Sequence, residues 1–439
     1  MKKFLPLMLS VVAANNMTAK NLSNNHTNII MIVVDDMGYG DFGCYGNREH
    51  NTPNIDRLAD EGILLTDFHT NGVVSSPTRA ALMTGRYQQY TGIEGVVTAA
   101  GHRDYGLSPK MPTIAKLLKK RNYKTVIFGK WHLGYDKKYN PINHGFDKFV
   151  GYVSGNVDYF SHIDQTGYED WWENDNLKPE NGYTTEIITD HAIDYIEKNK
   201  ETPFFVYIPY EACHTPLQGP NDRAIRFLED GKMKVKGTGR RDNNTIYKEM
   251  VESLDDNVGR IMKTLKKQGL EDNTFIVFFS DNGGAKYSCN KPWSGGKGSL
   301  LEGGHRVSSI VRWPNRIKPG SISDETFLTI DLMPTVCEIA GVSLDGIAYD
   351  GSSMVESLTK LNSMPERVLF WRTPKGICAR KGDWKIHTDR NYNNIRLYNL
   401  RDDKAEKNDI KDSNPNIVEE LINEIKKWDS NFKNIQQFT

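Results

Sequence analysis

Ile29-Ile30-Met31-Ile32-Val33-Val34-Asp35-Asp36 runs from six consecutive apolar residues, most of them β-branched, directly into two carboxylates. Such a run indicates a strand that is buried on both faces, as in the centre of a parallel sheet. Two adjacent buried carboxylates are costly unless positive charge meets them. A hard divalent cation, which prefers carboxylate oxygens, would supply that charge. The alternative for this segment alone is an ordinary turn in which Asp36 caps a helix.

Three more apolar runs have the same character, and segments with helical periodicity separate them. We expect strands at 124–128, 204–208 and 274–279, and helices at 107–123, 184–199 and 245–268. Alternation of strands and helices is typical of an α/β domain. The sequence therefore predicts a large, mostly parallel sheet with helices on both faces.

Polar side chains follow each of these four strands. They are Asp35 and Asp36, Lys130 and His132, His214, and Asp281 and Asn282. In sheets of this kind, ligands bind beyond the carboxyl ends of the strands. We therefore expect the four clusters to form one site. Taken singly, each segment also fits a plain turn: Lys130 and His132 would then be solvated, and Asp281-Asn282-Gly283 would be a common turn sequence.

Ser75-Ser76-Pro77-Thr78-Arg79 places a hydroxyl two residues before a proline and four before an arginine. Pro77 suits the first turn of a helix, which would put Ser75 just ahead of the helix N-terminus. Free backbone N–H groups and the helix dipole favour an anion there, and Arg79 adds a permanent cation. Lys297, bracketed by glycines, could approach the same anion closely. This segment alone also fits a simple helix cap.

Taken in order, these segments resemble the type I, formylglycine-dependent sulfatases of the alkaline phosphatase-like superfamily. The family signature, Cys/Ser-x-Pro-x-Arg followed by Leu-x-Thr-Gly, is matched in its serine variant from Ser75 to Gly85. The paired aspartates, Gly129-Lys130-Trp131-His132-Leu133-Gly134, the Asp281-Asn282 segment and the glycine-rich segment around Lys297 occur in the family's order. The chain departs from the family at Cys213, where most members have a proline before the histidine.

The resemblance implies a cofactor set and a role for each residue. Calcium would be held by Asp35, Asp36, Asp281 and Asn282, and a maturase for serine-type sulfatases would oxidise Ser75 to formylglycine. Arg79, Lys130 and Lys297 would surround the sulfate, His132 would contact the formylglycine hydrate, and His214 would assist departure of the alcohol. By position Ser154 resembles a sulfate-contacting serine. Asp158 and His162 are candidates to face the substrate.

The implied reaction is hydrolysis of a sulfate ester. The segment 151–179 is rich in Trp and Tyr, which suits stacking on a sugar, although packing explains the same residues equally well. We therefore predict a sulfated glycan, of the glycosaminoglycan or mucin type, as substrate. The alternatives are an arylsulfatase, a metal-dependent phosphatase or phosphodiesterase of the same superfamily, and a non-catalytic glycan-binding protein. The phosphatase alternative needs a second set of Asp and His metal ligands, which these motifs lack.

Composition and the two ends of the chain complete the prediction. The 439 residues carry 56 basic and 56 acidic side chains, so no overall charge favours nucleic acid or an anionic membrane. Residues 1–19 read as an export signal peptide, too short for a stable membrane span, which predicts a periplasmic or secreted protein. We expect a catalytic domain at 24–360. At 361–439 we expect a subdomain of short antiparallel strands (368–371, 383–387 and 395–400) followed by a helix that begins at Pro415.

Overall fold

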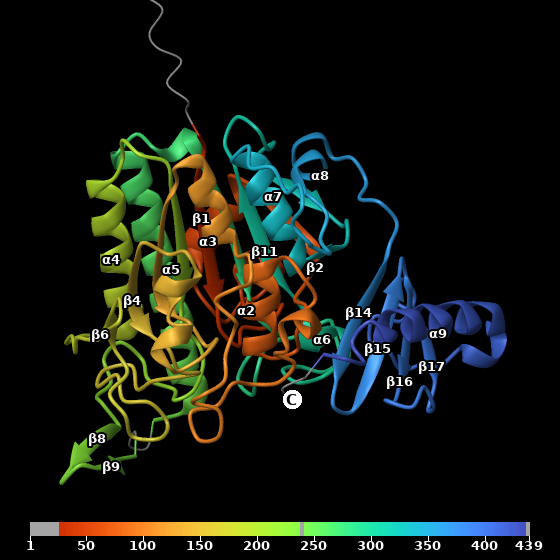
Figure 1. The fold of residues 1–439 in the computed structure, drawn as a ribbon, viewed down its shortest axis with the longest axis horizontal. Helices are drawn as coiled ribbons and strands as arrows, with labels where there is room; N and C mark the ends of the chain where they lie inside the picture. Colours follow the sequence, from red (N-terminus) through yellow and green to blue (C-terminus); the bar gives the residue numbers. More distant parts are fainter. Residues whose placement is uncertain (1–25, 238–240, 436–439) are drawn as a thin grey trace, which may run out of the picture.

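The computed structural model describes residues 26–237 and 241–435, so the expected signal peptide lies outside the described residues. Figure 1 shows a large sheet with helices on both faces and a smaller sheet beside it. The helices are α1 (Pro53–Asp60), α2 (Ser75–Thr84), α3 (Ile114–Leu118), α4 (Thr184–Lys198), α5 (Asn243–Lys267), α6 (Glu302–His305), α7 (Leu332–Ile339), α8 (Val355–Lys360) and α9 (Pro415–Ser430).

The large sheet has eleven strands, in the order β12-β2-β11-β10-β1-β7-β3-β4-β5-β6, with β13 also paired to β2. These strands are β1 (Asn28–Val34), β2 (Ile63–His69), β3 (Lys124–Lys130), β4 (Lys148–Tyr152), β5 (Trp172–Glu173), β6 (Asn176–Leu177), β7 (Phe204–Pro209), β10 (Thr274–Ser280), β11 (Arg306–Arg312), β12 (Ser321–Ser323) and β13 (Phe327–Leu328). The five central strands, from β10 to β4, are mutually parallel, and β11 runs antiparallel to both β10 and β2. The predicted mostly parallel sheet is confirmed.

Strand β1 lies between β10 and β7 and is buried along its whole length. Its alternate residues enter two separate cores. Ile29, Met31 and Val33 pack with α2, α3 and α7, whereas Ile30, Ile32 and Val34 pack with α1, α4 and α5. Because both faces are covered, an uninterrupted apolar run is the sequence this position requires.

The helix expected at 107–123 is much shorter in the structure. Only Ile114–Leu118 is α-helical, followed by a 3-10 turn. The Leu107 N–H donates instead to the carbonyl oxygen of Leu133, 2.8 Å away. Pro112 has no N–H to donate, and the Thr113 hydroxyl caps the helix by accepting the N–H of Lys116. The helix therefore begins after the proline rather than before it.

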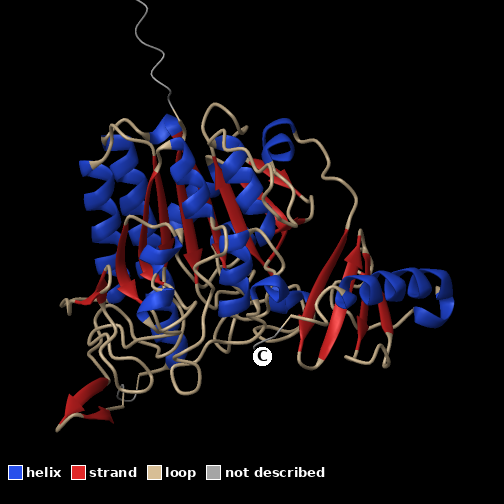
Figure 2. Cartoon of the chain, viewed as in Figure 1, coloured by secondary structure: helices blue, strands red, loops and turns tan. Residues whose placement is uncertain are grey.

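The C-terminal region forms the predicted small antiparallel sheet. Its strands are β14 (Val368–Thr373), β15 (Gly376–Lys381), β16 (Trp384–Thr388) and β17 (Arg396–Asn399), and α9 packs on the sheet through Leu421, Ile425 and Trp428. Strand β15 was not expected from the sequence. A separate hairpin of β8 (Arg226–Glu229) and β9 (Lys232–Val235) projects from the body of the molecule (Figure 2). In the described part of the chain, the helices are all too short or too polar to cross a bilayer.

Candidate active site

The four oxygen-bearing residues predicted to bind a metal lie together at the carboxyl ends of β1 and β10. Val34 and Ser280 are paired in the sheet register, so Asp35 and Asp281 follow on neighbouring strands. Asp36 and Asn282 come next, and the Asn282 amide donates to Asp36 Oδ1 over 2.8 Å. All four side chains are buried. The structure therefore brings these four predicted residues into one place.

Ser75 lies directly beside this group. Its Oγ is 3.3 Å from Asp35 Oδ1 and 3.4 Å from Asn282 Oδ1. Ser75 is the first residue of α2, and Val74 is the N-cap, so the serine is inside the helix rather than just ahead of it. The nucleophile expected from one segment and the oxygen ligands expected from two others thus meet at the N-terminus of a helix.

Arg79, one turn further along α2, is fully enclosed. Its Nη2 donates to Asp281 Oδ2 over 2.8 Å, and its Nη1 donates to the Lys130 carbonyl oxygen over 3.3 Å. Burial opposes the charge, but Asp281, Tyr207 and Asp35 outweigh it and raise the pKa of Arg79. The guanidinium is therefore a fixed positive charge. Tyr207, whose hydroxyl lies 3.5 Å from Nη1, was not identified from the sequence because it looks like any core residue of β7.

Two lysines complete the positive side of the site. The buried Lys130, at the end of β3, forms an ion pair with Asp35, and burial lowers the pKa of its ammonium. The Lys297 Nζ lies 2.7 Å from Asp36 Oδ1, and a quarter of its side chain is exposed (25 %). Burial lowers the pKa of Lys297, but Asp36 and Asp35 raise it by more. Of the two ammonium groups, that of Lys297 lies nearer solvent.

His132 is buried, and its Nε2 lies 3.1 Å from the carbonyl oxygen of Val97. Burial, followed by the nearby charges of Lys130 and Arg79, holds the pKa of this imidazole well below 6.5. The ring is therefore neutral at pH 7. A neutral imidazole facing a carbonyl oxygen carries its proton on that nitrogen. Its Nδ1, which has no partner among the described residues, is left as a free proton acceptor.

His214 lies beside Asp36. Its Nδ1 is 2.6 Å from the Thr215 carbonyl oxygen, and its Nε2 is 3.6 Å from Asp36 Oδ2. Backbone hydrogen bonds hold this turn: Cys213 donates to the Asp35 carbonyl over 2.8 Å, and the Asp35 N–H donates to the Ala212 carbonyl over 2.9 Å. Cys213, at the position where the family pattern has proline, therefore keeps the histidine at the site.

The three residues predicted to face the substrate are all buried. Ser154 directly precedes Gly155, where a Cβ atom would lie 2.6 Å from His132 Nε2, so this segment lies against the site. Asp158 is occupied elsewhere, because its carboxylate accepts four backbone N–H groups at 2.7–3.0 Å, two from its own loop and two from Ile225 and Arg226 at the start of β8. His162 stacks on Trp171 at 4.4 Å. Asp158 and His162 thus stabilise the fold of the segment 151–179.

Sequence reasoning missed Glu211, which lies two residues after the end of β7. Its Oε1 accepts the Val157 N–H over 2.8 Å, whereas Oε2 has no partner among the described residues. Burial raises the pKa of this carboxyl well above its ordinary value. The only signal in the sequence was its position, since it is a polar residue within two residues of the end of a buried strand.

The geometry agrees with the comparison to known proteins. The model of the sulfatase family matches residues 27–342. The chain belongs to the sulfatase family. This sulfatase is a sulfuric ester hydrolase.

Named relatives are similar over most of the chain. Human N-acetylgalactosamine-6-sulfatase is 32% identical over 386 residues, covering 82% of this sulfatase and 71% of the human protein. An arylsulfatase of Hemicentrotus pulcherrimus is 32% identical over 387 residues, covering 82% and 67%. The crystal structure of Ps i-CgsB in complex with k-i-k-neocarrahexaose has a TM-score of 0.84 and 31% identity, covering 94% and 95% of the two chains.

The site of this sulfatase has the donors that a hard cation requires. Carboxylate and amide oxygens are the ligands that calcium prefers. Asp281 offers one oxygen to Arg79, and its buried Oδ1 has no partner among the described residues. Ligand atoms of Asp35, Asp36 and His214 also lie within 4.8 Å of one another. The residues present therefore fit a divalent cation.

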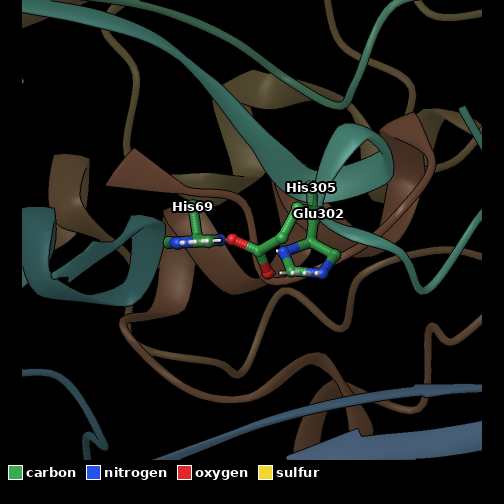
Figure 3. Close-up of side chains that lie close together, drawn as sticks. All are labelled: His69, Glu302 and His305. Atoms are coloured by element: carbon green, nitrogen blue, oxygen red, sulfur yellow. Dashed lines mark hydrogen bonds and ion pairs between the residues drawn. The ribbon is translucent and has the colours of Figure 1, made fainter. Parts of the chain in front are cut away.

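A second group of metal-binding residue types, His69, Glu302 and His305, lies where the C-terminal sheet meets the sulfatase core (Figure 3). The three side chains face one another, with 2.9 Å between the two histidine Nδ1 atoms. Cations already surround this group. Lys385 Nζ, from β16, is 2.8 Å from Glu302 Oε1, and Arg380 Nη2, from β15, is 2.7 Å from Asp67 Oδ2.

We call these buried ion pairs the interface network. Its members are Asp67, Glu302, Glu406, Arg306, Arg380 and Lys385. Three carboxylates balance three cations, and burial lowers the pKa of both His69 and His305, so the histidines add no charge. A further cation has no net negative charge to attract it. The network therefore joins the two sheets and is no second metal centre.

Proposed function

We propose that this sulfatase removes sulfate from a sulfated carbohydrate, using Ca²⁺ and a formylglycine formed at Ser75. The observation that carries the proposal is the approach of Ser75 Oγ to Asp35 Oδ1 and Asn282 Oδ1, at 3.3 and 3.4 Å. The carboxylates of this cluster are contacted by three cations, Arg79, Lys130 and Lys297. A nucleophile beside a cation site is what transfer from an oxyanion ester requires. Two relatives support a carbohydrate substrate. One, 32% identical, is named N-acetylgalactosamine-6-sulfatase, and the other, 31% identical, was solved in complex with k-i-k-neocarrahexaose.

The residues would share the reaction as follows. When bound, calcium supplies positive charge at the sulfate, and the hydrated aldehyde at position 75 supplies the attacking hydroxyl. Arg79, Lys130 and Lys297 orient the sulfate oxygens and stabilise the charge that develops on them. Calcium would be bound by Asp35 and Asp36, the carboxylates that form ion pairs with Lys130 and Lys297 in this structure.

Two histidines would handle the protons. His214, which is partly exposed, assists departure of the alcohol together with Lys297. His132 accepts a proton from the residue-75 hydroxyl at its free Nδ1, because Nε2 is committed to Val97. General acid and base catalysis each contribute on the order of 10²–10⁴-fold.

The proposal extends to maturation and location. We propose that the protein is exported to the periplasm or secreted, and that a maturase for serine-type sulfatases modifies Ser75. The mass of the tryptic peptide 58–79, from protein produced in its native host, tests the modification. A peptide lighter by two hydrogen atoms and reactive toward carbonyl reagents is expected. An unmodified serine from that host contradicts formylglycine chemistry.

Hydrolysis of small aryl sulfates is the second candidate, favoured by the 32% identity to an arylsulfatase. Sulfate release from the matured enzyme on sulfated monosaccharides, sulfated oligosaccharides and 4-nitrophenyl sulfate separates the two. We expect the highest kcat/KM on a glycan. Efficient aryl turnover with no release from any glycan would reject the carbohydrate proposal.

A further inference from the structure

A cavity of about 440 Å³ lies between the loop that follows Lys297 and the C-terminal sheet. One wall is formed by Gly298, Ser299 and Leu300. The opposite wall is formed by the β14–β15 turn, the end of β16 and residues near the start of β17. The cavity therefore opens between the two parts of the molecule that the interface network joins.

This cavity begins next to the catalytic group. Ser299 is two residues from Lys297, whose Nζ lies 2.7 Å from Asp36 Oδ1, so the Cα atoms of the two residues are at most about 7 Å apart. The Gly298 N–H donates to the Val73 carbonyl oxygen over 2.8 Å, two residues before Ser75. Figure 2 shows the β14–β15 turn at the same end of the molecule as the carboxyl ends of the central strands. A chain-like ligand with one unit at Ser75 can reach the cavity without crossing the fold.

The cavity is lined by unpaired positive charge. Lys375, in the β14–β15 turn, and Arg396, at the start of β17, are exposed, and neither has an ion-pair partner in the described part of the chain. Asp389 is the carboxylate on the lining, and it already accepts the N–H groups of Asn391 and Asn393 over 2.8 and 2.9 Å. The cavity therefore favours an anion.

We infer that this cavity binds a second, anionic sugar unit of the glycan whose sulfate ester is cut at Ser75. This inference rests on the proposed function and makes it more specific, because it selects a glycan with sulfate or carboxylate groups on successive units. A guanidinium and an ammonium group are suited to such groups, and the guanidinium can bind them through two parallel hydrogen bonds. Cavities of roughly 300–1,000 Å³ hold small ligands, so this one accommodates one or two sugar rings.

A comparison of long and short substrates tests the inference in the matured enzyme. The readout is kcat/KM on a multiply sulfated oligosaccharide divided by kcat/KM on 4-nitrophenyl sulfate, which is too short to reach the cavity. In Lys375→Ala/Arg396→Ala we expect this ratio to fall about tenfold or more, which corresponds to about 1.4 kcal/mol. Lys427→Ala, an exposed lysine on α9 outside the cavity, is the matched control. An unchanged ratio in the double variant would overturn the inference.

Direct binding separates this inference from the proposed function. Protein made without a maturase, and therefore unable to turn over substrate, is titrated calorimetrically with the same oligosaccharide. We expect the double variant to bind about tenfold more weakly than the parent. Binding that depends on the two residues, without hydrolysis by the matured enzyme, would overturn the proposed function and keep the inference. Equal binding by the parent and the double variant, or no binding by the parent, would overturn the inference itself.

Discussion

Arg79 binds only one of the two carboxylate oxygens of Asp281. The Arg79 Nη2 and Nε both donate to Asp281 Oδ2, at 2.8 and 3.1 Å, while Oδ1 of the same group is buried without a partner among the described residues. A buried carboxylate oxygen without a hydrogen-bond partner is costly. The arrangement is explained if Oδ1 faces a cation and Oδ2 is held still by the arginine. This relationship leads to the first prediction.

Calcium should stabilise the folded protein through this carboxylate. After removal of metal with a chelator, we expect millimolar Ca²⁺ to raise the Tm of the parent protein by a few degrees, because a ligand at one hundred times its Kd contributes about 2.7 kcal/mol. Asp281→Asn should need at least tenfold more Ca²⁺ for the same shift. Asp345→Asn, an exposed carboxylate away from the site, should respond like the parent. If Ca²⁺ does not change the Tm of the parent protein, the proposal that this site binds calcium is contradicted.

His132 should act as a base that stays neutral across the working range of pH. Burial and the neighbouring cations hold its pKa well below 6.5, so its unprotonated form persists as the pH falls to 6 and lower. We expect His132→Ala to lower kcat by about 10²–10⁴-fold. In the parent, kcat should show no protonation step near 6.5 that is due to this residue. A step there that disappears in the variant would contradict the assignment.

Gly155 should matter because of the imidazole beside it. A methyl group at this position would lie 2.6 Å from His132 Nε2, and the glycine is not in the left-handed region. Gly155→Ala should therefore displace the ring from Val97 and lower kcat at least tenfold, with a much smaller change in Tm. Gly101→Ala, where the nearest atom is 3.6 Å away, is the control and should leave both values unchanged. Equal activity of the two variants would show that the ring position is unimportant.

The sequence predicted those features that depend on local pattern. A β-branched apolar run such as Ile29–Val34 favours a strand buried on two faces, and polar residues that follow neighbouring parallel strands lie at the same edge of the sheet. The family motifs then identified Ser75, Lys130 and His214 individually, and the structure brings them together. Asp158 shows the limit of this approach, because nothing in the sequence reveals that four backbone N–H groups, one of them from Arg226 in β8, occupy its carboxylate.

The interface network could not be predicted, for a similar reason. Its partners lie far apart in the chain, as Asp67 on β2 and Arg380 on β15 do, and each looks like an ordinary surface charge in its own segment. Strand β15 was missed because its residues do not alternate between polar and apolar. Only the packing of the small sheet against the large one gives these charges their common, buried position.

The same network should make the protein sensitive to acid. Burial alone would raise the pKa values of Asp67 and Glu302. Arg306 and Arg380 nevertheless hold the pKa of Asp67 well below 3.8, and Lys385 holds the pKa of Glu302 well below 4.5. The unfolded chain takes up protons at the ordinary values while the folded protein does not. Stability from these two groups is therefore complete above about pH 5 and is lost as the pH falls through 4.5 and 3.8 toward the folded-state values.

Glu302→Gln should reveal this contribution. Lys385 keeps Glu406 as a partner, but neutralising Glu302 leaves the three buried cations of the network with only two carboxylates, and an unbalanced buried charge costs on the order of 3–5 kcal/mol. We expect a lower Tm than the parent at pH 7 and a smaller difference at pH 4, because Glu302 itself no longer titrates. Glu356→Gln, which breaks the exposed pair with Lys360 on α8, is the matched control and should follow the parent at both values. If Glu302→Gln keeps the parent's Tm at pH 7, the network does not hold the two sheets together.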